Sequence, residues 1–124
     1  MCEGKTDVMR IIDKDAPVTV AELAEMAGKM FGDLVKAVVD VKSVAMAIDA
    51  AMHADEEQEL LESGSAQADL WGINLYPDLF GTDDFVEFDS VINIRPVLNN
   101  RSRGVEDERL RDEIRRIVAG LVQA

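Results

Sequence analysis

The sequence predicts an α+β fold in which about three helices pack against a mostly antiparallel sheet. Apolar residues alternate with a period of two in several short segments, which is typical of strands. Three other segments repeat apolar residues at helical spacing beside capping residues. The expected order, β-α-β-β-α-β-β-α, places strands in adjacent pairs, which favours α+β. The length suits a single domain over residues 1–124, with residues 1–6 frayed.

The first half begins with a strand over residues 8–12, and the region around Pro17 ends it. Thr19 and Glu22, three residues apart, form a capping-box pattern, so a helix should begin there. Gly32 is placed to end this helix. Its apolar face consists of Leu23, Met26, Ala27 and Met30.

A hairpin is predicted over residues 35–48. The apolar residues of its first strand are Val35, Ala37, Val39 and Val41, and those of its second are Val44, Met46 and Ile48. The apolar positions therefore change parity, which implies a turn or bulge near Lys42 and Ser43. We expect two antiparallel strands joined at that point.

Another helix is predicted over residues 55–62, with Leu60 and Leu61 facing inward. Asp49 and Asp55 are both suitable N-caps for it. The last helix should begin after Asp107, and its apolar stripe repeats at helical spacing. That stripe is Leu110, Ile114, Ile117, Val118 and Leu121. We expect the helices to pack on one face of the sheet.

Two strands are predicted between these helices, over residues 70–76 and 85–95. In the first, Gly72 indicates that another group closely approaches the backbone. The second alternates without a break up to Pro96. We therefore interpret residues 85–95 as one long or bent strand, the alternative being a turn at residues 89–90.

The aromatic residues cluster between Trp71 and Phe88. We expect these two in the core, because aromatics at strand spacing are usually buried. Tyr76 and Phe80 border a loop instead. They could form one wall of a cleft or of a dimer contact.

The net charge of −12 resides in the middle of the chain. Residues 43–94 contain 12 acidic residues and no Lys or Arg. We interpret this segment as a solvated acidic surface, the alternative being attraction of a basic partner or a hard cation. Such a charge disfavours binding to nucleic acid or to an anionic membrane.

A cytoplasmic location is expected. Cys2 is the only cysteine, so no disulfide can form within the chain, and a lone thiol suits a reducing compartment. No apolar run follows the first residues, so no signal peptide is predicted. The longest charge-free stretches have eight residues, whereas a membrane span needs about 20.

The motifs of several enzyme classes are missing from the sequence. The eight glycines form neither a phosphate-binding loop nor a dinucleotide fingerprint. No serine lies in a Gly-x-Ser-x-Gly elbow. One histidine and one cysteine exclude a cluster of nitrogen and sulfur metal ligands. The sequence therefore assigns neither a cofactor nor a metal.

The first candidate site is the segment from His53 to Glu56. His53 is the only side chain whose ordinary pKa lies near neutrality, so it is the natural general base. Asp55 or Glu56 could orient the imidazole or help to bind a divalent cation. The alternative is structural, with Asp55 capping a helix and His53 filling the loop before it.

The second candidate site is a polar strand face and the loop that follows it. Its residues are Asn74, Asn93, Arg95, Asn99, Asn100, Arg101 and Arg103. Guanidinium groups bind carboxylate or phosphate in a planar fork, and asparagines add donors and acceptors. A pocket for a small anion could be built this way. The alternative is that the arginines pair internally with the acidic segment, for example with Glu87 or Asp89.

Five ordered stretches resemble an uncharacterised family of small archaeal and bacterial domains. They are FGDLVKAVVDV (31–41), MHAD (52–55), DLWGINLYPDL (69–79), FVEFDSVINIRP (85–96) and NRSRGVED (100–107). The resemblance spans most of residues 31–107. It implies a shared fold and an intracellular setting, and it implies no activity.

The sequence does not reveal what the protein does, so its function is unknown at this point. Of the classes left open, it favours a binding module over an enzyme. The Asn/Arg face would bind an anionic ligand or an acidic partner surface. The alternative is a small hydrolase-like enzyme with His53 as general base, Asp55 or Glu56 beside it and a divalent cation as an option. A third hypothesis is a homodimer formed through the polar face.

Overall fold

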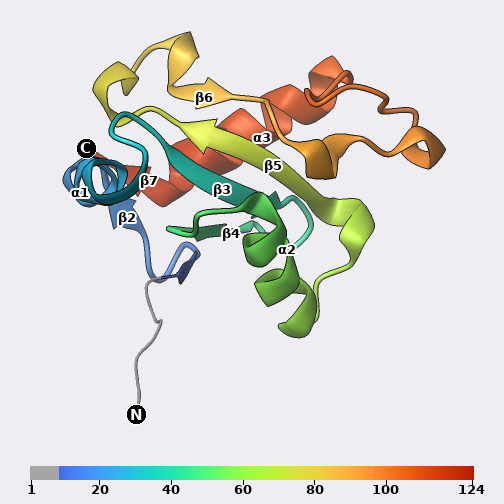
Figure 1. The fold of residues 1–124 in the computed structure, drawn as a ribbon, viewed down its shortest axis with the longest axis horizontal. Helices are drawn as coiled ribbons and strands as arrows, with labels where there is room; N and C mark the ends of the chain where they lie inside the picture. Colours follow the sequence, from blue (N-terminus) through green and yellow to red (C-terminus); the bar gives the residue numbers. More distant parts are fainter. Residues whose placement is uncertain (1–8) are drawn as a thin grey trace.

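The protein is built around a five-stranded sheet (Figure 1). The structure is a computed structural model that describes residues 9–124. The strand order is β1-β4-β3-β5-β6, and all neighbouring strands are antiparallel. The strands are β1 (Arg10–Ile12), β3 (Val35–Asp40), β4 (Ala45–Ile48), β5 (Leu70–Leu75) and β6 (Val86–Glu87). The helices are α1 (Val20–Met30), α2 (His53–Glu62) and α3 (Glu108–Leu121). The predicted α+β class is confirmed.

A second, parallel pair joins β2 (Val18–Thr19) to β7 (Val122–Gln123). Two residues are too few to show a period, so the alternation pattern does not reveal these strands. The pair ties the end of α3 to the start of α1. The expected fraying of residues 1–6 and the first residue of the strand predicted over residues 8–12 lie outside the described residues.

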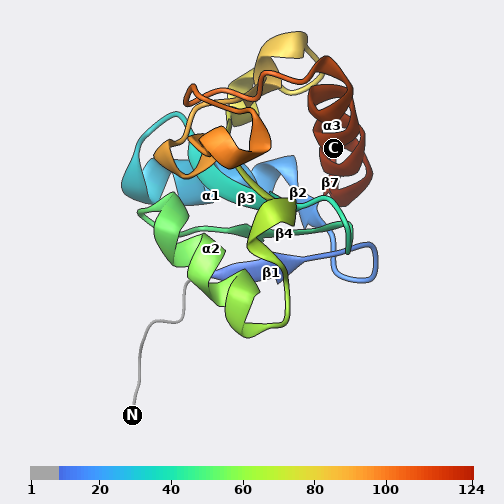
Figure 2. The same ribbon diagram turned by 90° about the vertical axis from the view of Figure 1, so that its right-hand side faces the viewer.

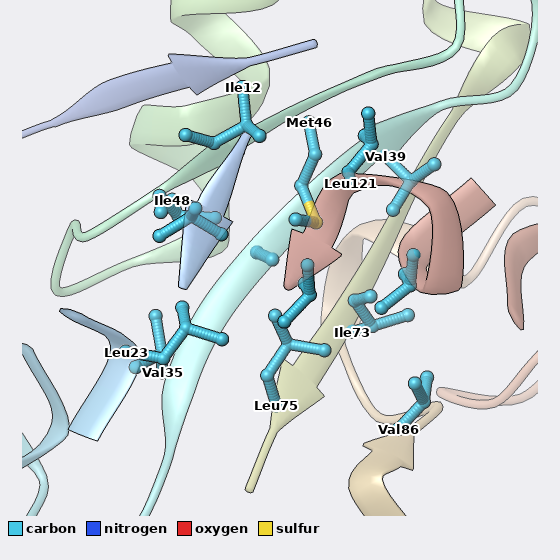
Figure 3. Close-up of a cluster of buried hydrophobic side chains, with 14 of the residues drawn as sticks. Ile12, Leu23, Val35, Val39, Met46, Ile48, Ile73, Leu75, Val86 and Leu121 are labelled. Atoms are coloured by element: carbon cyan, nitrogen blue, oxygen red, sulfur yellow. The ribbon is translucent and has the colours of Figure 1, made fainter. Parts of the chain in front are cut away.

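Helices α1 and α3 cover one face of the sheet and enclose the main core (Figure 3). Leu23 from α1, Ile73 from β5 and Leu121 from α3 are each at most 1% exposed and belong to this cluster. Truncating such a side chain to alanine typically costs about 2–5 kcal/mol. This core fixes the position of α3 relative to the sheet.

Helix α2 covers the opposite face of the sheet (Figure 2), so the prediction that the helices share one face is wrong. Leu60 from α2 packs there against Val38 and Leu70, which point away from the main core. Both faces of β3 and β5 carry apolar side chains. Burying only one face would therefore leave apolar surface in water.

The predicted cap of α1 is present. The Glu22 N–H donates to Thr19 Oγ1 at 3.1 Å, and the Thr19 N–H donates to Glu22 Oε1 at 3.0 Å. Asp107 likewise caps α3 by accepting from the Arg109 N–H at 2.9 Å. Met30, expected on the buried face of α1, is 40% exposed because it lies in the last position of the helix.

The predicted N-caps of α2 are wrong. The helix begins at His53, two residues earlier than expected, and its N-cap is Met52, which makes no side-chain capping bond. Asp55 lies inside the first turn, so its carboxylate interacts with the helix dipole without capping the helix. Asp49 lies outside the helix with a left-handed φ of 72°.

The hairpin between β3 and β4 has the predicted turn. Asp40 organises it, because its carboxylate accepts from the Lys42 N–H at 2.9 Å and the Ser43 N–H at 3.0 Å. This is the local turn chemistry expected of aspartate. The parity change in the sequence therefore located the turn correctly.

Residues 85–95 do not form the predicted single strand. Only Val86–Glu87 pairs with β5, and a 3-10 turn occupies Val91–Asn93. The Asn93 side chain takes the place of a strand, because its Oδ1 accepts from the Gly72 N–H at 2.8 Å and its Nδ2 donates to the Gly72 carbonyl at 2.9 Å. The apolar alternation in the sequence is real. However, the backbone N–H and C=O groups of Gly72, which a neighbouring strand would normally bind, are bound by the Asn93 side chain instead.

No helix within residues 9–124 has the length and apolar character needed to cross a membrane.

The close approach predicted at Gly72 is confirmed, and Ser90 is the approaching group. A Cβ at position 72 would lie 2.5 Å from the Ser90 Cβ, which is far below van der Waals contact. Gly72→Ala should therefore destabilise the fold by about 1–3 kcal/mol through overpacking. Urea denaturation at neutral pH measures this loss.

Gly28→Ala provides the matched control for the same substitution. A Cβ at Gly28 points into open space on helix α1, so alanine there should stabilise by roughly 0.5–1 kcal/mol. Equal effects of the two substitutions would contradict the packing role of Gly72.

Candidate functional site

Helix α2 brings His53 and Glu56 together on its sheet-facing side and leaves Asp55 exposed. His53 is 7% exposed and its Nε2 lies 2.7 Å from the Ile73 carbonyl oxygen. A carbonyl can only accept, so Nε2 carries the hydrogen. Burial is the main cause that lowers the pKa of His53, which favours the neutral imidazole.

Glu56 is fully buried beside this histidine. Its Oε2 accepts from the Ala50 N–H at 3.1 Å, and its Oε1 finds no hydrogen-bond partner among residues 9–124. Burial raises the pKa of Glu56 well above its usual range, because the carboxylate loses water without gaining a cation. The hypothesis that His53 acts as a base stays a prediction.

A metal site is not indicated here. Within the part of the chain that the structure describes, no group of three or more His, Cys, Asp or Glu side chains is arranged to hold a metal ion. The described residues around His53 therefore supply no ligand set for a divalent cation.

The fold uses the side chains of Asn93 and Asn100 internally. Asn100 Nδ2 donates to the carbonyl oxygens of Asn93 at 2.7 Å and Gly104 at 2.8 Å, and its Oδ1 accepts from the Glu106 N–H at 2.8 Å. Asn93 binds the backbone of Gly72 in the same way. Both amides are buried, so they shape the polar loop instead of facing a ligand.

Arg95 is also engaged inside the protein. Its guanidinium donates to the carbonyl oxygens of Ile92 and Gln67, both at 2.8 Å, and to that of Leu70. It stacks 4.8 Å from the centre of the Trp71 ring and lies 3.8 Å from Glu57. This arrangement resembles the internal alternative of the sequence analysis, with Glu57 as the acidic partner instead of Glu87 or Asp89.

Asn74 lies apart from the polar loop, on the α2 face of the sheet. Its Nδ2 donates to Glu87 Oε1 at 2.9 Å, and the Tyr76 hydroxyl donates to the same oxygen at 2.9 Å. Burial and this hydrogen bond raise the pKa of Tyr76 to about 12. Arg103 pairs with Asp89, which is the internal pairing that the sequence analysis gave as its alternative. The predicted polar residues therefore do not form one continuous face. Those that are exposed are Asn99, Arg101 and Arg103.

Two hollows along α3 contain the groups that sequence reasoning missed. The first, called here the arginine hollow, has a volume of about 480 Å³. Its lining residues are Phe88, Ser102, Gly104, Val105, Glu106, Arg111 and Arg115. The second, called here the apolar hollow, has a volume of about 230 Å³. Its lining residues are Phe80, Gly81, Thr82, Asp83, Phe85, Val86, Arg115, Val118 and Ala119.

The arginines of the first hollow are held in place by neighbouring groups. Arg111 Nη1 donates to the Val105 carbonyl oxygen at 2.9 Å. The Arg115 guanidinium lies 5.0 Å from the centre of the Phe88 ring, in a cation–π contact. Arg115 Nη1 also lies 3.9 Å from Asp112 Oδ1. A second acidic neighbour, Glu106, accepts from the Arg101 N–H at 2.9 Å, and this bond is the main cause that lowers its pKa.

A signal for this site exists in the sequence. Seven of the 13 basic residues lie within residues 95–116, against five acidic residues in the same range. Helical spacing then places Arg111 and Arg115 one turn apart on the same side of α3. Only the tertiary structure shows that the 102–106 loop and Phe88 face that side.

The geometry defines a small α+β domain with a sheet covered on both faces and an arginine-lined groove beside its last helix. The chain belongs to the family described as "Protein of unknown function (DUF5674)", whose sequence model matches residues 10–121. The resemblance to an uncharacterised family is thereby confirmed. No curated protein and no solved structure matches the chain.

Arg95→Lys should destabilise the domain by about 2–4 kcal/mol, because an ammonium group cannot reproduce the fork that binds three carbonyl oxygens. Urea denaturation measures the change. Arg101→Ala is the control, since Arg101 is exposed, and its effect should stay within about 0.5 kcal/mol. Similar losses for both variants would show that Arg95 has no special structural role.

The raised pKa of Glu56 predicts a pH-dependent stability. Its contribution is fully present below the pKa of the unfolded chain and is lost as pH rises through the raised folded value. Glu56→Gln should therefore gain stability over the parent protein as pH increases from 5 to 9. Thermal unfolding across this range tests it, and a parent–variant difference independent of pH would contradict it.

Proposed function

We propose that this protein is a binding module that holds an anionic group, either of a small ligand or of a partner surface, in the arginine hollow. The observation that supports it is the pair Arg111 and Arg115, one helical turn apart beside a hollow of about 480 Å³. This proposal keeps the class of function predicted from the sequence. It moves the site from the Asn/Arg face to the groove between α3 and the 102–106 loop.

The two arginines suit carboxylate or phosphate recognition. A guanidinium group offers parallel N–H donors in a fork that matches either anion. Arg111 donates one hydrogen bond, from Nη1, to the Val105 carbonyl oxygen, and the Arg115 guanidinium stacks on the Phe88 ring. Both are therefore partly fixed before a ligand arrives, which lowers the ordering cost of binding.

The charge distribution favours a small anion over a polyanion. Residues 43–94 carry 12 acidic residues and no basic ones, so an extended polyanion would meet repulsion outside the hollow. Glu106 lines the hollow but is already bonded to the loop backbone. A compact carboxylate or phosphate can contact the arginines without approaching the rest of this surface.

A cytoplasmic location is part of this proposal. The anionic group in the hollow can also belong to a protein partner or to a second copy of the chain. The alternative function, with His53 as general base, is supported by its buried imidazole beside Glu56 and by the burial that lowers its pKa. Its Nε2 is committed to the Ile73 carbonyl, which leaves Nδ1 as the basic atom. We rank this alternative second.

The double variant Arg111→Gln/Arg115→Gln should weaken the binding of inorganic phosphate and of benzoate at least tenfold. Both are titrated into the ¹⁵N-labelled protein while amide chemical shifts at residues 102–106 and 111–115 are followed. The loss is expected because the variant removes both positive charges and both guanidinium forks while keeping polar side chains.

Arg109→Gln is the matched control, because it removes a positive charge from an exposed position of α3 that does not line the hollow. It should leave the titrations nearly unchanged. If Arg109→Gln weakened binding as much as the double variant, the anions would be attracted by the overall positive charge of α3 and not bound in the arginine hollow. The absence of any shift in these residues with either anion would reject the proposed function.

A further inference from the structure

The apolar hollow lies next to the arginine hollow and has a different character. Phe80 forms its exposed side at 38% exposure, with its ring edge-on to Phe85 at 5.2 Å between centres. Val118 and Ala119 line it from α3. Its volume of about 230 Å³ exceeds the roughly 150 Å³ of an engineered cavity in another protein that accepts benzene. It can therefore receive a ring or a short alkyl chain.

Arg115 connects the two hollows because its side chain lines both. Along α3, Arg111, Arg115 and Ala119 follow at intervals of four residues and so share one side of the helix. Each interval advances about 6 Å along the helix axis. A charged head near the arginines and an apolar body about 6 Å away would thus occupy one groove.

We infer that the ligand is an amphiphilic monocarboxylate, with its carboxylate at Arg111 and Arg115 and its ring or alkyl chain in the apolar hollow. This inference rests on the proposed function and specifies its ligand class. Charge complementarity selects this occupant, since Arg115 adjoins the apolar lining. Asp83 lies in the lining of the same hollow and disfavours a second negative charge there.

The test uses a series of carboxylates with one head group: acetate, butyrate, hexanoate and octanoate, with benzoate as the ring. Affinity for the full chain is measured by amide chemical shifts and calorimetry. Each buried methylene should strengthen binding roughly fourfold until the hollow is full. The shifts should spread from residues 111–115 to Val86 and Val118 as the chain lengthens.

Ala119→Leu fills the apolar hollow from an exposed helical position. It should remove the dependence on chain length and leave the binding of acetate unchanged. Ala24→Leu adds the same side chain at an exposed position of α1 away from the hollow, and it should keep the dependence. Thermal unfolding of both variants verifies that they fold.

Distinct outcomes separate this inference from the function on which it rests. Equal affinity for acetate and octanoate, lost in Arg111→Gln/Arg115→Gln, would overturn the amphiphile and retain the anion-binding function. Failure of every anion to bind would remove both. Octanoate binding that survives the double arginine substitution would show an apolar ligand without a required charge. A dimer on native mass spectrometry that Ala119→Leu dissociates would assign the apolar hollow to a second copy of the chain.

Discussion

The pairing of the Asn93 side chain with the Gly72 backbone is the interaction on which the C-terminal half depends. Strand β5 is buried along its whole length, so unpaired backbone groups on its open edge would cost free energy. A carboxamide presents an N–H donor and a carbonyl acceptor side by side, as a strand backbone does, and Asn93 uses its oxygen and one of its two N–H groups on Gly72. The close contact of Ser90 with Gly72 is possible only because residue 72 has no side chain.

This closed edge determines the path of the chain that follows. Asn93 also donates to the Arg103 carbonyl, and Asn100 binds the Asn93 carbonyl. The loop between them is thereby held to the sheet edge by buried amides. Its end at Val105 accepts from Arg111 of α3. The groove between the loop and α3 is a consequence of this chain of hydrogen bonds rather than of any local sequence motif.

Polar residues of the same type therefore serve opposite purposes in this protein. Arg95 is surrounded by carbonyl oxygens and the Trp71 ring, where an arginine contributes mainly to packing and backbone satisfaction. Arg111 and Arg115 instead line a hollow beside α3. His53 and Glu56 represent a third case, because α2 buries both with few partners. Burial lowers the pKa of His53 and raises that of Glu56, so the uncharged form of each is favoured.

The sequence by itself determined the α+β class, the capping box at Thr19, the turn at residues 42–43 and the apolar stripe of α3, because each depends on neighbours within a few residues. It also located Gly72 as a point of close approach. Only the tertiary structure decided which face α2 covers, where β6 ends and which arginines line a hollow. Those outcomes depend on side chains such as Asn93, which competes with backbone for partners about 20 residues away. The alternation of apolar and polar residues along the sequence does not show which side chain will bind a distant backbone group.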